Sequence, residues 1–158
     1  DRGYLRRDPT KNRAIEVHWD AGSGAVIDRR PVTHVPLVGD VAAGAGVLAA
    51  QNVEEVMPLP SDLTGEGELF MLRVRGDSMI EAGINEGDTV IIKRTDTADN
   101  GKIVVALIDE HEAMLKRIRK KGKVVALESA NKNYETKIFG PDRVKVQGVL
   151  VSLYRNFH

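Results

Sequence analysis

The run Leu69-Phe70-Met71-Leu72-Arg73-Val74, followed by Arg75-Gly76-Asp77-Ser78-Met79, shows the pattern on which the rest of the chain is built. Its apolar part predicts a strand, and the Gly, Asp and Ser that follow are typical of a tight turn. Further short β-rich runs, separated by Gly, Asp and Asn, cover 35–41, 54–60, 88–93, 102–108, 113–119, 124–128 and 144–153. Many short strands at this spacing predict an all-β fold, a barrel or folded sheet, with one short helical turn at 78–84.

The beginning of the chain has a different character. Residues 8–34 are polar, include the small and flexible run 20–24, and show no sustained period of 2 or 3.6, which predicts a linker. Within the preceding residues, 1–7, the run Tyr4-Leu5-Arg6-Arg7 is compatible with one short strand. We therefore expect a short segment at 1–7, a linker at 8–34 and one β domain at 35–158.

The composition excludes several classes of function. The 23 Lys and Arg balance the 23 Asp and Glu, so no net charge draws the chain to nucleic acid or to an acidic membrane. The absence of cysteine excludes disulfides, thiol catalysis and cysteine-ligated metals, and fits a cytosolic protein. No apolar run approaches the ~18–20 residues of a membrane span, and we see no signal segment. The histidines lack metal-ligand spacing and no nucleotide-binding glycine motif occurs, so we expect no metal and no cofactor.

The first candidate for chemistry is Ser78, at the end of the predicted strand. A tight turn at Gly76-Asp77-Ser78-Met79 would present the hydroxyl and leave backbone N–H groups free to bind an oxyanion. The motif is not the Gly-x-Ser-x-Gly nucleophile elbow. The simpler interpretation is that Ser78 caps the helical turn that follows.

The second candidate is Lys116. Alternate residues of a strand share a face, so Lys116 shares its face with the apolar Met114 and Ile118. Burial among apolar neighbours lowers the pKa of a lysine, and a neutral amine can take a proton from a serine hydroxyl. The alternative is a lysine that extends from the sheet margin into solvent. The basic run 116–123 could contact phosphates, but a solvated hairpin tip is the simpler interpretation.

Two further segments bear on the chemistry. The small residues of 41–46, which include Ala43 and Gly44, would let an extended backbone enter a narrow cleft, although a flexible loop is the simpler interpretation. A Ser-His-Asp triad would have to recruit His111 from the charged turn 109–112, which we regard as a weak alternative.

The order and spacing of these motifs resemble LexA repressors over roughly Val35 to Arg155. The row Val35-Pro36-Leu37-Val38-Gly39-Asp40-Val41-Ala42-Ala43-Gly44 resembles the cleavage region of that family, and Gly76-Asp77-Ser78-Met79 resembles its nucleophile motif. The Gly-Asp turn at 85–88, the Asn-Gly turn at 100–101 and the lysine of Leu115-Lys116-Arg117 are in corresponding places. The run Tyr4-Leu5-Arg6-Arg7 resembles the last strand of the winged-helix domain, so 1–7 would be a remnant of that domain.

The resemblance implies an S24-type serine peptidase that cuts itself, in a bacterial cytoplasmic repressor of the SOS DNA-damage response. Ser78 would be the nucleophile, Lys116 the general base, and the backbone amides of Asp77 and Ser78 the oxyanion hole. Ala43–Gly44 would be the scissile bond. The implied partners are RecA filaments on single-stranded DNA, a second copy of the chain, and operator DNA bound through the mostly missing amino-terminal domain.

One residue departs from the family pattern, and other classes remain open. Many family members have Thr two residues before the lysine, where this chain has Met114. A type I signal peptidase would need a membrane anchor. A UmuD-type polymerase accessory protein usually carries Cys-Gly at its cleavage site and has no winged-helix remnant. A catalytically dead dimerisation module would not need Ser78, Lys116 and the Ala43–Gly44 pair intact.

Overall fold

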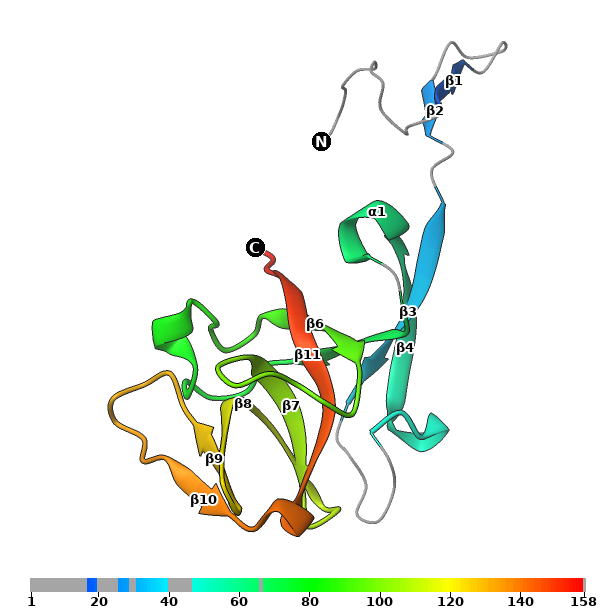
Figure 1. The fold of residues 1–158 in the computed structure, drawn as a ribbon. Coiled ribbons are helices and arrows are strands. Elements are labelled where there is room, and N and C mark those ends of the chain that lie inside the picture. The colour runs from blue at the N-terminus through cyan, green and yellow to red at the C-terminus, as the bar shows by residue number, and fades with distance from the viewer. Residues whose placement is uncertain (1–16, 20–25, 29–30, 40–46, 66, 158) are drawn as a thin grey trace.

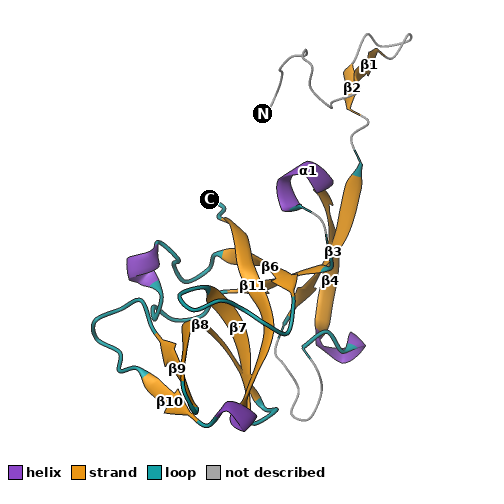
Figure 2. Ribbon diagram, viewed as in Figure 1, coloured by secondary structure: helices purple, strands orange, loops and turns teal. Residues whose placement is uncertain are grey.

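The computed structural model describes residues 17–19, 26–28, 31–39, 47–65 and 67–157, and these fold mostly as β strands (Figures 1 and 2). The strands are β1 (Val17–Trp19), β2 (Val26–Asp28), β3 (Val32–Val38), β4 (Val53–Pro60), β5 (Leu69–Arg73), β6 (Thr89–Arg94), β7 (Ile103–Ile108), β8 (Glu112–Lys121), β9 (Val124–Glu128), β10 (Lys137–Phe139) and β11 (Val144–Tyr154). The helical elements are α1 (Ser61–Thr64) and three 3-10 turns, η1 (Ala50–Asn52), η2 (Ile80–Ala82) and η3 (Pro141–Arg143). The predicted all-β class is confirmed.

One mixed sheet contains nine of these strands, in the order β10-β9-β8-β7-β11-β6-β5-β3-β4. Every neighbouring pair is antiparallel except β3 and β5, which run parallel. Strands β1 and β2 form a separate hairpin. The long strand β11 pairs with β7 along its first half and with β6 along its second. Figure 1 shows β11 running between the β8–β10 side of the sheet and the β3–β4 side.

The core consists of apolar clusters on the two faces of the folded sheet. Strand β6 shows how one strand serves both faces, because Val90 and Ile92 pack into one cluster while Ile91 packs into another. The first cluster also holds Val47 and Met79, each only 2% exposed. A residue directly after Ser78 is therefore anchored in the core, which fixes the position of the turn that carries the serine.

Several predicted boundaries differ from the structure. Strand β3 begins at Val32, before the predicted strand at 35–41, because 32–34 pair with 58–60 of β4. The predicted linker, 8–34, thus includes the start of β3 as well as the β1–β2 hairpin. Strand β10 and the helical elements at 50–52, 61–64 and 141–143 were not predicted, since runs of three or four residues show no recognisable periodicity. The predicted remnant at 1–7 lies outside the described residues.

The described helices are all short. None of them has the length and apolar character that a helix needs to cross a bilayer.

Candidate active site

The turn that carries Ser78 is held to the start of β6 by backbone hydrogen bonds. Val74 donates its N–H to the carbonyl oxygen of Asp88 at 2.8 Å, and Gly87 donates to the carbonyl oxygen of Val74 at 3.0 Å. Gly76 then adopts a φ of 75°, in the left-handed region that favours glycine. The chain therefore reverses directly after β5 and places Ser78 at the end of the sheet, as the sequence pattern predicted.

The simpler interpretation of Ser78, a helix cap, is wrong. The 3-10 turn η2 has Met79 as its N-terminal capping residue, and no side chain caps it by a hydrogen bond. The Met79 side chain is buried, and its Sδ accepts a hydrogen bond from the N–H of Ala130 at 3.3 Å. No backbone hydrogen bond joins the N–H of Asp77 or of Ser78 to another described residue.

Lys116 lies in the middle of β8, where its surroundings oppose its charge. It pairs with Val104 on the neighbouring strand β7, and Val104 is fully buried. The Lys116 side chain itself is half-buried. Burial is the main cause that lowers the pKa of Lys116 below its usual value; repulsion from Lys137 lowers it further, and the carboxylate of Glu112 partly opposes both. This is the direction that its position between apolar neighbours predicted.

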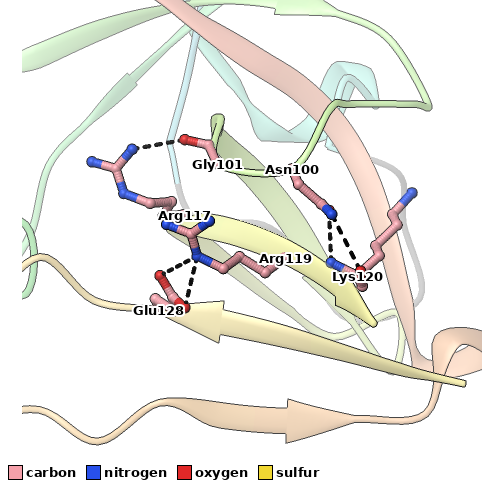
Figure 3. A network of polar contacts seen from close by, with 6 residues as sticks. All are labelled: Asn100, Gly101, Arg117, Arg119, Lys120 and Glu128. Atoms are coloured by element: carbon pink, nitrogen blue, oxygen red, sulfur yellow. Dashed lines mark hydrogen bonds and ion pairs between the residues drawn. The ribbon is translucent and has the colours of Figure 1, made fainter. Parts of the chain in front are cut away.

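The register of β8 is fixed by polar contacts beyond Lys116 (Figure 3). The Asn100 side chain makes two hydrogen bonds to the backbone of Lys120. Its Oδ1 accepts from the Lys120 N–H at 2.7 Å, and its Nδ2 donates to the Lys120 carbonyl oxygen at 3.2 Å. Arg117 donates to the carbonyl oxygen of Gly101 at 2.7 Å, and Arg119 donates to both carboxylate oxygens of Glu128 at 3.0 Å. The basic run is thus a hairpin arm and tip, as its simpler interpretation held.

Ser78 and Lys116 line the same cleft, although 38 positions separate them in the chain. The cleft has a volume of about 770 Å³. Gly39, the last described residue before the segment 40–46, also lines it, and so do Met114 and Tyr134. The structure therefore places the two predicted catalytic residues on the wall of one cleft. The predicted scissile pair, Ala43 and Gly44, lies outside the described residues.

His111 also lines the cleft, and Asp109 in the same turn is bonded to Arg143. The carboxylate of Asp109 accepts two hydrogen bonds from Arg143, at 2.9 and 2.6 Å. Asp109, the acidic residue of this turn nearest to Arg143, is therefore paired with an arginine, and the His111 alternative stays untested.

Comparison with known proteins places the chain in a family. Residues 36–151 match the profile of the family described as Peptidase S24-like. The chain is also 62% identical, over 176 aligned residues, to the LexA repressor of Pelagibacter ubique (strain HTCC1062), an alignment that covers 99% of this chain and 78% of that protein. The chain belongs to the LexA family of S24-like peptidases. The resemblance drawn from the sequence is confirmed.

The LexA-family match spans the elements that build the cleft. It begins in β3, just before Gly39, and ends in β11, so Ser78 and Lys116 both lie within it. Family membership makes the chain a repressor with a serine-type, self-cleaving peptidase domain.

Sequence reasoning missed one part of the site, the segment 129–136 between β9 and β10, which we call the β9–β10 loop. Asn131, 4% exposed, and Tyr134 both contact Asp77, the neighbour of Ser78. The only signal in the sequence was an aromatic residue in a polar loop, and that signal cannot reveal a contact with a turn more than 50 positions away.

Proposed function

We propose that this chain is a repressor of the SOS response to DNA damage that inactivates itself by cutting its own Ala43–Gly44 bond with a Ser78–Lys116 dyad. The observation that supports this most directly is that Ser78 and Lys116 line one cleft together with Gly39. Ala43 follows Gly39 by four positions, a reach of at most about 14 Å for extended chain.

The far end of the same segment also supports cleavage within one chain. Val47 is buried in the apolar cluster that holds Met79, the residue after Ser78. The segment 40–46 is therefore joined at one end to the cleft and at the other to the core beneath the nucleophile turn. Tethering of this kind gives a high effective concentration of substrate, so the cleft needs little affinity for foreign peptides.

The chemical steps follow from the two side chains. The neutral amine of Lys116 accepts the proton of the Ser78 hydroxyl, and Oγ attacks the carbonyl carbon of Ala43. The N–H groups of Asp77 and Ser78 stabilise the oxyanion. The ammonium of Lys116 then protonates the departing amine of Gly44, and water hydrolyses the acyl-serine to free the Ala43 carboxylate.

Three partners belong to this proposal. RecA filaments on single-stranded DNA favour the state of the chain in which the cleavage segment occupies the cleft. The domain pairs with a second copy of itself. Operator DNA is the third partner, bound through a winged-helix domain whose last strand the run Tyr4-Leu5-Arg6-Arg7 resembles.

The experiment is the intact mass of the protein after incubation from about pH 6 to about pH 10, without RecA. Deprotonation of Lys116 should speed the reaction, so fragments 1–43 and 44–158 should accumulate faster as the pH rises. Ser78→Ala and Lys116→Ala should stop it. Ser152→Ala, a serine of β11 that does not line the cleft, and Lys120→Ala, another lysine of β8, should cut normally.

Two results would overturn the proposal. Cleavage of Ser78→Ala at the same bond would exclude the dyad. A chain that stays intact at every pH, and also with RecA, single-stranded DNA and ATP, would indicate a catalytically dead dimerisation module. If RecA filaments fail to accelerate a reaction that does occur, the chemistry stands and the RecA partnership is wrong.

A further inference from the structure

Residues 130–134 of the β9–β10 loop are bound to the nucleophile turn and to the 3-10 turn η2 that follows it. Asn131 donates from Nδ2 to the carbonyl oxygen of Asp77 at 2.8 Å. Glu81 donates its N–H to the carbonyl oxygen of Ala130 at 2.7 Å, and its carboxylate accepts from the N–H of Lys132 at 2.9 Å. Since Asn131 is almost fully buried, its amide has little access to water, and this bond supports the carbonyl beside Ser78.

Tyr134, in this loop, contacts both Asp77, the residue before Ser78, and Lys116. Its hydroxyl donates to Oδ1 of Asp77 at 2.5 Å, and its backbone N–H donates to the carbonyl oxygen of Asn131 at 3.0 Å. The Nζ atom of Lys116 lies 5.5 Å from the centroid of its ring. One side chain thus contacts the residue next to the nucleophile and the amine of the base.

The two contacts have different physical consequences. The hydroxyl bond to a carboxylate limits the movement of the turn that carries Ser78. The ring face attracts an ammonium but not a neutral amine, so it favours protonated Lys116. Other charged groups act on the same amine: Glu112 on β8 also favours the ammonium, while Lys137 on β10 disfavours it. His111, Glu135, Arg73 and Arg75 also line the cleft, and the carboxylate of Asp77 accepts the hydrogen bond of the Tyr134 hydroxyl.

We propose that Tyr134 is a positioning residue of the dyad, which holds the nucleophile turn through its hydroxyl and retains Lys116 as an ammonium over its ring. This inference rests on the proposed Ser-Lys chemistry and adds a regulatory role to it. The hydroxyl sets how fast the competent site reacts. The ring sets the pH at which the site becomes competent, and so keeps cleavage slow near neutral pH.

The test is the pH profile of the first-order cleavage rate constant in Tyr134→Phe and Tyr134→Leu. Tyr134→Phe keeps the ring, so its midpoint should stay in place while its plateau at high pH falls about tenfold, the loss expected for one hydrogen bond to a charged group. Tyr134→Leu should show the same lower plateau and a midpoint lower by about half a pH unit. Tyr154→Phe is the matched control, since the Tyr154 hydroxyl bonds only to Asn156 among the described residues.

A second measurement is independent of cleavage. In the uncleavable Ser78→Ala protein, the ¹⁵N shift of the Lys116 Nζ atom is followed across pH with Tyr, Phe or Leu at 134. The Leu protein should titrate about half a unit below the other two. Thermal melting of each variant shows that it is folded.

The outcomes distinguish failure of the Ser78–Lys116 dyad from failure of the Tyr134 role. If the unsubstituted chain never cuts but the Leu protein still titrates lower, the dyad proposal fails while the ring contact stands. If Phe and Leu leave the Lys116 titration and the midpoint where Tyr has them, the ring role is wrong. If the plateau of Tyr134→Phe equals that of the unsubstituted chain, the hydroxyl role is wrong.

Discussion

Lys116 can act as a base only while its amine is neutral, so each side chain near it affects the chemistry. Met114 is one of these neighbours, two residues before Lys116 on β8. It lines the cleft, is half-buried, and packs against the apolar cluster that contains Val104 and Ile118. A methionine here lengthens the apolar wall beside the lysine but offers no hydrogen bond to orient it.

The first prediction concerns Met114→Thr. A hydroxyl at this position should orient the neutral amine of Lys116 and raise the cleavage rate constant several-fold, measured by intact mass. The free energy of unfolding should fall by about 1–2 kcal/mol, because the thioether packing is lost. Met114→Val is the control, since it has the shape of threonine without the hydroxyl. An equal rate for Val and Thr would show that the hydroxyl does nothing.

A second prediction concerns Asp88, which is 1% exposed and accepts 2.7 Å hydrogen bonds from Nε and Nη2 of Arg155. Hydrogen bonding to Arg155 is the main cause that lowers the Asp88 pKa to about 2, against the opposing effect of burial. A carboxyl whose pKa falls on folding stabilises the protein fully above its unfolded pKa, about 4, and this contribution declines as the pH falls towards 2.

Asp88→Asn should therefore cost roughly 2–3 kcal/mol of unfolding free energy at neutral pH, measured by urea denaturation. The difference from the unsubstituted protein should shrink once the pH drops below about 4. Asp96→Asn, an exposed aspartate, should change little at either pH. A difference for Asp88→Asn that stays constant down to about pH 3 would contradict this account.

At the scale of elements, β11 holds the two halves of the sheet together, and Gly148 is where it changes partner. The register of β11 against β7 shifts between Val146 and Gly148, and Gly148 pairs with both neighbouring strands. A Cβ added there would lie 2.4 Å from Cγ2 of Ile92 and 2.6 Å from the carbonyl oxygen of Lys93. No side chain fits at this crossing of strands.

Gly148→Ala should destabilise the protein by about 2–3 kcal/mol, measured by denaturant unfolding, because buried strands would have to separate. Gly122→Ala at the β8–β9 hairpin tip is the comparison. Its Cβ meets nothing within 4 Å, so only its φ of 57° opposes the change, at about 1 kcal/mol. Equal costs at the two positions would mean that the crossing can relax.

The elements themselves were largely predictable from sequence. The strands from β3 to β9, and β11, match predicted runs to within a few residues, because alternating apolar residues and Gly, Asp and Asn turns are local signals. Strand β10 was missed because it is defined by pairing with β9 across the β9–β10 loop, and three residues carry no pattern of their own.

At the scale of the whole molecule, the route of the chain predicts that the proposed cleavage is a first-order process. The segment before the core anchor at Val47 starts from Gly39 at the cleft itself. We expect the cleavage rate constant to stay unchanged over about a hundredfold range of protein concentration, measured by intact mass. A rate constant that rises with concentration would show that one copy cuts another.

The sequence by itself determined the β class of the fold, the family, and which serine and lysine to consider, because periodicity, turn residues and motif spacing are properties of the linear chain. Only the tertiary structure decided that Ser78 and Lys116 line one cleft with Gly39, that Met79 rather than Ser78 caps the 3-10 turn, and that Tyr134 lies between Asp77 and Lys116. These facts depend on contacts between residues that are distant in the sequence, and those contacts are set by how strands pair and pack.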